Sequence, residues 1–389
     1  MLMRNSFSSS CLLFVFLSCF PAASHAVAED PAHFYAAPEK RESGSGTDRT
    51  NAAHYLEPDF WNTVRERLEE QPVTVRFAAG EYDAGTLTLR TIGHPDHPLV
   101  LEGDTDGGTV FTGEVHRHMQ IRGARNLTLR HFNFTGKTRN FAMHIVGYPA
   151  DNPVENLLLE HCSFHDLPVA DRGGVGIAGR VTELTIRDSR FERIGESAHA
   201  HMIYSTSSGP GALRFHNNHF IDTPGDYLRL RSRRDYAEIK GNTFISNSAR
   251  DNRPFVALIA FNAEGRNEII GDNVHIEGNL FRYHPVSRWS WDRGIAVCLS
   301  GYGQDPDPDT RYMLKPEEAR TLEKGSLAER RALLNDVMKI NPDTLRIKDN
   351  TYENIRYQVG FGSRADEGKG HGWTGFVDLK PVIKAPGKQ

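Results

Sequence analysis

The chain has 389 residues, of which 38% are hydrophobic and 25% are charged, and its formal net charge at pH 7 is −4. This length allows two ordinary domains. The acidic balance argues against a general nucleic-acid-binding protein, so any polyanionic partner would have to meet a local basic patch.

The first 28 residues have the features of a signal peptide. Arg4 precedes the apolar stretch CLLFVFLSCF at 11–20, which is too short to cross a bilayer. Small residues at Ala26 and Ala28 offer cleavage sites. We therefore expect residues 1–28 to be removed and the mature protein to be secreted or periplasmic, with no segment inserted in a membrane.

Residues 29–72 are predicted to form an N-terminal segment and a capping helix. Within 51–71, Phe60, Val64 and Leu68 recur at helical spacing. A helix there would cover the open end of the first coil of the repeat structure described next, whose edge would otherwise recruit other strands.

A repeat recurs between residues 126 and 352. Each unit has alternating apolar residues, then a small or amide residue, any residue and an aromatic, as in NLTLRHFNF (126–134) and TLRIKDNTY (344–352). Such self-similarity, with strand alternation in every unit, is typical of a solenoid. The aromatics are Phe134, Phe164, Phe191, Phe220, Phe244, Phe281 and Tyr352.

Asparagine stands two residues before the aromatic in the later units, at Asn218, Asn242, Asn279 and Asn350. Because stacked β-coils lie about 4.8 Å apart, asparagines at the same turn can form an amide ladder. Leucine-rich repeats also carry an asparagine, but they need a helical return arm that these units lack. The predicted fold is all-β, a single-stranded right-handed parallel β-helix over residues 73–363.

A second apolar strand follows each aromatic, as in HAHMIYS (199–205) and DYLRLRS (226–232). These strands should stack into one long parallel sheet whose outer face is open for binding. A helix-like stretch within about 305–343 explains the widest gap in the repeat, and we interpret it as a helical insertion. The C-terminal tail, 364–389, is predicted to be loop-like.

Two cysteines remain after the signal peptide. Cys162 precedes a repeat aromatic, and Cys298 lies on a second strand several coils later. At about 4.8 Å per coil they are too far apart for a disulfide, so we expect two free thiols.

The alternation of leucine and arginine in LRLR (228–231) is the main functional signal. If the leucines point into the coil, Arg229 and Arg231 point outward. The preceding coil carries His199 and His201, which would face outward beside the arginines. Surface arginines are usually solvated or paired, but their convergence with histidines suggests a site.

An exported arginine patch suits an acidic polysaccharide, because guanidinium pairs bidentately with carboxylate or sulfate. We place the candidate catalytic groups at Arg231, His201 and Tyr204. The candidate substrate-binding groups are Arg229, His199, Arg233, Arg234, His144 and Tyr227.

The stretch LRLRSRRDYAEIKGNTF (228–244) resembles the β-helical alginate lyase and chondroitinase B family, and the resemblance extends over roughly residues 126–284. It implies a polysaccharide lyase in which Arg231 matches an arginine at the end of a strand. The family's lysine base falls near Tyr204. The positions of its calcium-binding acidic pair read Ser197 and His199 here. The expectation is no cofactor, with Glu196 and Asp226 as weak candidates for a Ca²⁺ ion.

The reaction implied is β-elimination on a uronic-acid polymer. A cation on the carboxylate stabilises the enolate-like intermediate, and a base removes the neighbouring proton. Arg231, helped by Arg229, is the predicted cation, and either His201 or Tyr204 is the base. Because these two are three residues apart, an ideal strand puts them on opposite faces, so a bend at 204–206 would be needed for both to serve.

Two other functions are considered. A glycoside hydrolase needs two carboxyl groups about 5–9.5 Å apart, for which Glu196 and Asp226 are the candidates. A non-catalytic glycan-binding protein would use the arginines without a base. In every case the expected partner is an acidic polysaccharide, not nucleic acid, and the expected state is a monomer.

Overall fold

In the computed structural model the β-helix lies in a unit that begins at Pro31. The predicted signal peptide, 1–28, lies outside the described residues. The structure describes residues 30–149, 151–207, 209–231, 234–247, 253–261, 273–285, 294–302, 311–312, 315–336, 343–364 and 373–379.

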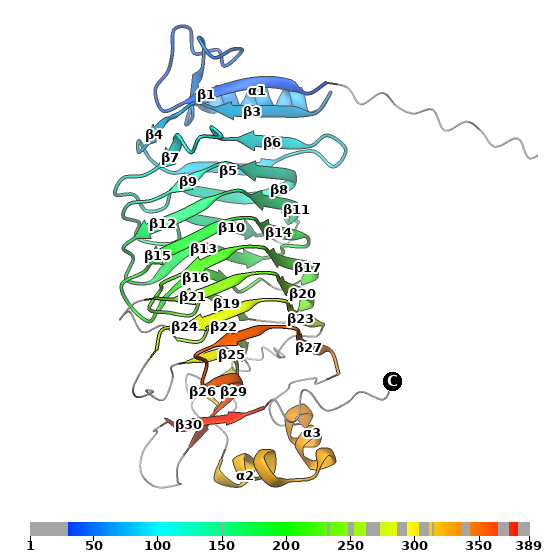
Figure 1. Cartoon of the computed structure of the whole chain (residues 1–389). Coiled ribbons are helices and arrows are strands. Elements are labelled where there is room, and N and C mark those ends of the chain that lie inside the picture. Colours follow the sequence, from blue (N-terminus) through cyan, green and yellow to red (C-terminus); the bar gives the residue numbers. More distant parts are fainter. Residues whose placement is uncertain are drawn as a thin grey trace, which may run out of the picture. The chain divides into compact units, whose positions relative to one another are not determined.

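Three ladders of parallel strands wind around one core (Figure 1). The first ladder holds the apolar strands of the repeat: β1 (Ala32–Ala37), β3 (Val73–Phe77), β6 (Leu99–Glu102), β8 (Met119–Arg130), β11 (Val154–Glu160), β14 (Leu184–Arg187), β17 (Gly209–His216), β20 (Arg234–Lys240), β23 (Val274–Glu277) and β27 (Leu345–Lys348). The second ladder holds β5 (Leu87–Ile92), β10 (Met143–Gly147), β13 (Arg172–Gly179), β16 (Ala200–Ser205), β19 (Leu228–Arg231), β22 (Val256–Phe261), β25 (Ile295–Tyr302) and β29 (Tyr357–Arg364). The third ladder holds the short strands β4 (Gly80–Tyr82), β7 (Thr109–Phe111), β9 (Asn133–Phe134), β12 (Ser163–Leu167), β15 (Arg190–Ile194), β18 (His219–Ile221), β21 (Thr243–Ser246), β24 (Leu280–Tyr283) and β28 (Thr351–Glu353).

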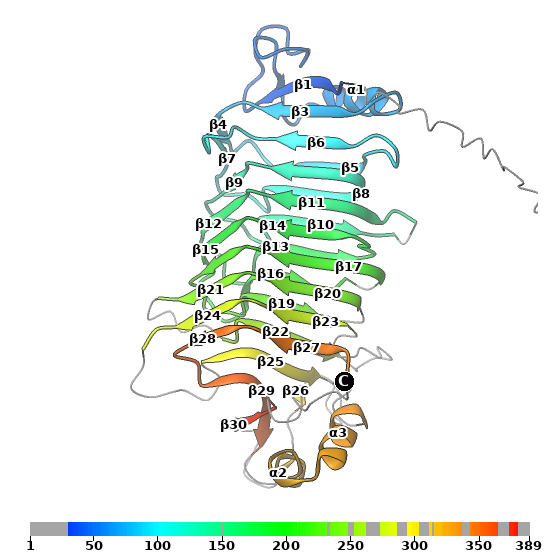
Figure 2. The ribbon, with the colours of Figure 1, turned by 45° about the vertical axis from the view of Figure 1, so that its right-hand side comes forward.

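The strand pairings establish a parallel β-helix, as the sequence predicts. Each coil supplies one strand to each ladder, and successive coils stack in register (Figure 2). The long strand β8 belongs to two ladders, because its first half pairs with β5 and β10 and its second half with β6 and β11.

The repeat aromatics form a continuous stack on the third ladder, inside the coil. The rings of Phe164 and Phe191 are stacked 4.9 Å apart between centroids and nearly parallel, with an interplanar angle of 1°. The same spacing joins Phe220 to Phe244, and the stack ends at Tyr352. Its phenylalanines are fully buried. The aromatic position of the repeat therefore fills the core at the same place in each coil.

The predicted amide ladder is present beside this stack. Asn218 Nδ2 donates to Asn242 Oδ1 (3.1 Å), Asn242 Nδ2 to Asn279 Oδ1 (3.0 Å), and Asn279 Nδ2 to Asn350 Oδ1 (2.9 Å). The side chains also satisfy backbone groups at the corner, since Asn242 Nδ2 donates to the carbonyl of Phe215 (2.8 Å). The asparagine side chains thus supply hydrogen-bond partners for buried backbone groups at this turn.

Asn242→Ala should lower the free energy of unfolding by about 2–4 kcal/mol, because the backbone N–H of Asn218 and the carbonyl of Phe215 would lose their buried partner. Urea unfolding followed by circular dichroism measures the change. The control Asn247→Ala removes an exposed amide and should leave the midpoint in place. Equal midpoints for the two variants would contradict a stabilising ladder.

The N-terminal end differs from the prediction in where the coil begins. Helix α1 (Pro58–Leu68) is shorter than the predicted 51–71, and β2 (Ala53–His54) precedes it. Strand β1 pairs in parallel with β3, so the β-helix starts before residue 73. The predicted residues Phe60, Val64 and Leu68 are buried, and Phe60 packs edge-on against Phe34 of β1 at 6.2 Å between ring centroids.

The C-terminal end also corrects one expectation. Two helices, α2 (Pro316–Lys324) and α3 (Leu327–Asp336), follow the short strand β26 (Arg311–Tyr312) within the predicted insertion. The tail is not all loop, because β30 (Trp373–Asp378) pairs antiparallel with β29. Strand β29 closes the second ladder, so its outer edge is open for pairing with a later segment of the chain.

Cys162 and Cys298 are both free and buried, as predicted. No helix among the described residues is long and apolar enough to span a bilayer.

Candidate functional site

The predicted arginines and the tyrosine meet on the second ladder. Strands β16 and β19 are neighbours, and Tyr204 is in register with Arg229. Arg231 donates from NH1 to Tyr204 Oη (3.0 Å), and the Arg229 guanidinium carbon lies 5.4 Å from the centroid of the Tyr204 ring. All three residues are half-buried. One phenol therefore lies between two guanidinium groups on the outer face of the coil.

His201 reaches the same cluster because β16 bends. Met202 and Ile203 are both fully buried in the core, so the alternation of side chains breaks between them and not at 204–206. Consequently His201 and Tyr204, three residues apart, lie on one side, with 5.4 Å between ring centroids. The neighbouring coil repeats the pattern, with Tyr227 and Leu228 both buried between Asp226 and Arg229.

His201 is only 3% exposed and lies between the guanidinium of Arg229 and the carboxylate of Asp226. Arg229 NH1 donates to His201 Nε2 (3.2 Å), and Asp226 Oδ2 lies 3.7 Å from His201 Nδ1. Because a guanidinium cannot accept, Nε2 must be the acceptor and the imidazole proton must sit on Nδ1, facing Asp226. Burial, followed by the charges of Arg229 and Arg253, lowers the pKa of His201 well below its usual value. The imidazole is therefore neutral at neutral pH.

Asp226 is the site residue that the sequence reasoning undervalued. The predictions treat it as a weak metal candidate, whereas its carboxylate is 1% exposed and also lies 3.7 Å from Arg229 NH1. Asp226 Oδ1 and His201 Nδ1 have no hydrogen-bond partner among the described residues. The signal available in the sequence is the common spacing of three in His201–Tyr204 and Asp226–Arg229.

Two of the predicted binding residues, Tyr227 and His199, do not join the cluster, and the side chains of two others are not described. Tyr227 points into the core and is fully buried, and its hydroxyl donates to the carbonyl of Ile245 (2.6 Å), so its assignment to substrate binding is wrong. The prediction that His199 shares a strand face with His201 is wrong, because His199 precedes β16 in an exposed turn. Arg233 lies outside the described residues. Arg234 begins β20, and its side chain is not described.

His144 belongs to a second cationic group, two coils away from Tyr204 on the same ladder. The register runs from His144 to Gly176 and then to Tyr204. Arg117 NH1 donates to His144 Nδ1 (2.7 Å). Burial and the charges of Arg117, Arg172 and Arg122 lower the pKa of His144 to about 4, so this imidazole is neutral beside three cations.

On β13, the strand between the two groups, the position in register with His144 and Tyr204 is Gly176. A Cβ at Gly176 would lie 2.2 Å from Cδ2 of Phe141, so only glycine lets that ring lie over the strand. Phe141 is 5% exposed, and its ring centroid is 5.5 Å from that of His144 and 6.2 Å from that of Tyr204. The ring of Phe141 thus lies beside both His144 and Tyr204 at this position of the ladder.

The residues do not fit a calcium ion. Calcium takes carboxylate and carbonyl oxygens, whereas His199 carries an imidazole and the Ser197 hydroxyl donates to the carbonyl of Ala170. Asp226 faces a guanidinium and an imidazole. Glu196 is exposed. Across the described ranges, no group of three or more His, Cys, Asp or Glu side chains is placed to hold a metal.

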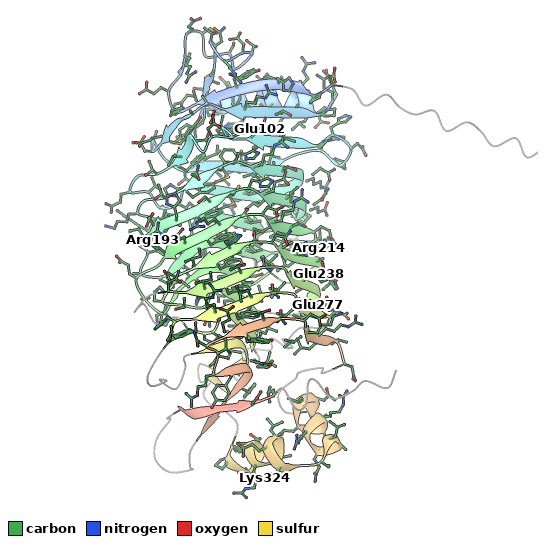
Figure 3. The ribbon with its side chains drawn as sticks, in the orientation of Figure 1. Glu102, Arg193, Arg214, Glu238, Glu277 and Lys324 are labelled. Carbon is green, nitrogen blue, oxygen red and sulfur yellow. The ribbon has the colours of Figure 1, made fainter. Side chains whose placement is uncertain are left out.

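A separate cluster of both acidic and basic residues lies on the first ladder, where Arg214, Glu238 and Glu277 follow one another down the coils (Figure 3). Glu238 accepts from Tyr236 and Lys240 and lies 3.0 Å from His216 Nε2. These charges are matched by neighbours on adjacent coils, so we interpret the cluster as a structural network.

Buried neutral histidines make the fold sensitive to acid. His118 lies in the core at the position of Met202 in its own coil, and neither ring nitrogen has a hydrogen-bond partner among the described residues. Burial lowers its pKa from 6.5 to about 4. Since the unfolded chain binds the proton first, the free energy of unfolding falls as the pH drops from about 6.5 toward about 4.

His118→Met should therefore remove about 2 kcal/mol of the stability loss between pH 7 and pH 5. Urea unfolding at the two pH values measures it. The control His219→Gln changes an exposed histidine and should keep the parent's pH dependence. An unaltered pH dependence in His118→Met would contradict the assignment.

No protein-family model and no curated protein matches the chain. Among solved structures, the chain is similar to a pectate lyase, Pel9A, at 15% identity and a TM-score of 0.47, covering 68% of this chain and 67% of that one. It is similar to the family 6 alginate lyase AlyGC at 13% identity and a TM-score of 0.31, covering 73% of this chain and 42% of AlyGC. A mannuronic acid-specific family 6 polysaccharide lyase from human gut microbiota shows 11% identity and a TM-score of 0.21, covering 69% of this chain and 81% of that one. The chain thus spans about two fifths of the length of AlyGC, and all three similar structures are polysaccharide lyases.

Proposed function

We propose that the protein is an exported polysaccharide lyase that cleaves a uronic-acid-containing polysaccharide by β-elimination. The observation that carries this proposal is the phenol of Tyr204 between the guanidinium groups of Arg231 and Arg229. The reaction needs a base and a carboxylate-binding cation within reach of the same sugar. A surface binding site for an acidic polymer would need the cations but not the phenol.

Arg231 is the proposed partner of the substrate carboxylate. A guanidinium carries five N–H donors, so a carboxylate can share Arg231 with the Tyr204 hydroxyl. Charge develops on the carboxylate as the neighbouring proton leaves, and a fixed cation stabilises that charge. Arg229 is held by His201 and Asp226, which fixes its guanidinium against the face of Tyr204.

Tyr204 is the proposed base, and His201 a positioning residue. Tyr204 is half-buried, whereas His201 is 3% exposed with Nε2 covered by Arg229. Acting as its phenolate, Tyr204 takes the proton from the carbon next to the carboxylate. The electron pair forms the new carbon–carbon double bond, and the bond to the glycosidic oxygen breaks. The proton that Tyr204 took up passes to that oxygen, which restores the phenolate.

The group of Arg117 and His144 is the proposed contact for a neighbouring sugar of the same chain. It lies two coils from Tyr204, about 9.5 Å along the stack. Arg117 and Arg122 have no ion pair among the described residues, so a second carboxylate would find uncompensated positive charge there.

The test is incubation of the purified protein with alginate, polygalacturonate and glycosaminoglycans while ultraviolet absorbance is followed. Elimination creates an unsaturated, absorbing end on one product, and hydrolysis creates reducing ends without it. A rise in absorbance with one of these polymers is the expected result. Reducing ends without absorbance would instead support a glycoside hydrolase, and salt-sensitive binding without cleavage would support a glycan-binding protein.

A further inference from the structure

A cleft of about 540 Å³ lies at the N-terminal end of the β-helix, away from the candidate site. It is formed by β1, by the loop over residues 38–52 and by the turns that follow β3 and β6. The coil of β3 is four coils from that of β16, about 19 Å along the stack, and the cleft borders the first ladder, not the second. Its volume is within the range of about 300–1,000 Å³ typical of small-molecule sites.

Arginine predominates among the charged residues of this cleft. Arg41, Arg49 and Arg76 line it together with Glu102 and Asp104. Glu102, labelled in Figure 3, is already engaged, since it lies 3.4 Å from Arg76 Nε and 2.8 Å from Arg130 NH2. Arg41 and Arg49 have no ion pair among the described residues, and within that part of the chain the Arg41 guanidinium donates only to the backbone carbonyl of Arg49, at 3.4 Å.

The loop that presents these two arginines is held rigidly. Gly46 donates to the carbonyl of Asn51 (2.7 Å) and accepts from the backbone N–H of Tyr35 (2.8 Å). Its φ is +74°, and a Cβ there would lie 2.5 Å from Cε2 of Phe60, so the loop sits directly on the capping helix. The side chain of Asn51 donates to Asp48 Oδ1 (3.1 Å). A preordered loop reduces the entropy lost when a ligand binds.

We infer that this cleft is a non-catalytic binding site for a short acidic saccharide, whose carboxylate pairs with Arg41 and Arg49. Guanidinium pairs bidentately with a carboxylate. Asp104 can accept from sugar hydroxyls. Tyr35 and Ala78 supply apolar surface for the face of a sugar ring. The inference goes beyond the proposed lyase reaction and does not depend on it.

The experiment uses the full chain with Arg231→Ala, which is expected to suppress cleavage, and the saturated trimers of mannuronate, guluronate and galacturonate as probes. Arginine modification by phenylglyoxal, read by peptide mass spectrometry, reports each guanidinium separately. At least one trimer should protect Arg41 and Arg49 while leaving Arg67, an exposed arginine of α1, at its unprotected rate. Adding Arg41→Ala and Arg49→Ala should lower the affinity measured by calorimetry about tenfold or more, whereas Arg67→Ala should not.

Three outcomes would overturn the inference. Equal modification of Arg41 and Arg49 with and without every trimer would show that the cleft does not bind them. Equal protection by a carboxyl-reduced trimer would remove the requirement for acid, and equal protection by sulfate alone would leave only a general anion site. None of these readouts depends on cleavage, so a protein that cleaves no uronate polymer but shows the protection would refute the proposed reaction and support this site.

Discussion

Arg231→Ala is expected to lower kcat about 10²- to 10³-fold on the polymer that the parent cleaves, because the cation that stabilises charge on the substrate carboxylate is removed. The side chain is half-buried on the outer face, where it donates to the Tyr204 hydroxyl, so its loss should leave the packing of the core intact. Initial rates from ultraviolet absorbance, together with the urea midpoint, measure the two effects. Arg231→Lys should recover part of the rate, since lysine keeps the charge but lacks the planar fork.

The matched control for this experiment is Arg125→Ala. Arg125 is a surface arginine of β8 that pairs with Glu155 (3.0 Å), and its loss should leave kcat and KM at the parent's values. If Arg231→Ala cleaves uronate polymers as fast as the parent, the lyase site lies elsewhere on the coil.

Tyr204→Phe is expected to lower kcat about 10²- to 10⁴-fold with a smaller change in KM, because it removes the proposed base and keeps the ring against Arg229. His201→Gln should cost less, about tenfold, since an amide can still accept from Arg229 in place of Nε2. Steady-state rates on one defined oligosaccharide compare the two. The opposite ranking, with His201→Gln the more damaging change, would make His201 the base.

The pH profile gives an independent check on the role of His201. Its pKa is lowered well below 6.5 by burial and by Arg229 and Arg253, so protonation, which would break the bond from Arg229, occurs only at acid pH. In the parent, kcat/KM should therefore show no loss attributable to His201 between pH 7 and 6.5. In His201→Gln the acid limb due to the imidazole should disappear. An acid limb that persists unchanged in His201→Gln would exclude this role.

The repeat could be predicted from sequence because its physical cause is local. Strand alternation sets the buried positions, and the aromatic and the asparagine recur at one place in each coil, where stacking and amide bonding act between neighbouring coils. The same alternation correctly placed Arg229 and Arg231 outside and Leu228 and Leu230 inside. The ends of the chain were less predictable. Strands β1 and β30 form by pairing with the edges of β3 and β29, and this pairing depends on the tertiary structure.

What the sequence determined by itself is thus the coil, its internal ladders and the outward direction of the arginines. Only the tertiary structure decided which side chains accompany them. The expectation that side chains alternate between the two faces assumes a straight strand. In β16 two consecutive residues, Met202 and Ile203, are both buried, so that His201 and Tyr204 lie on one side. The same pattern in the next coil buries Tyr227 and brings Asp226 beneath His201, a contact between residues 25 positions apart that depends on the stacking of one coil on another.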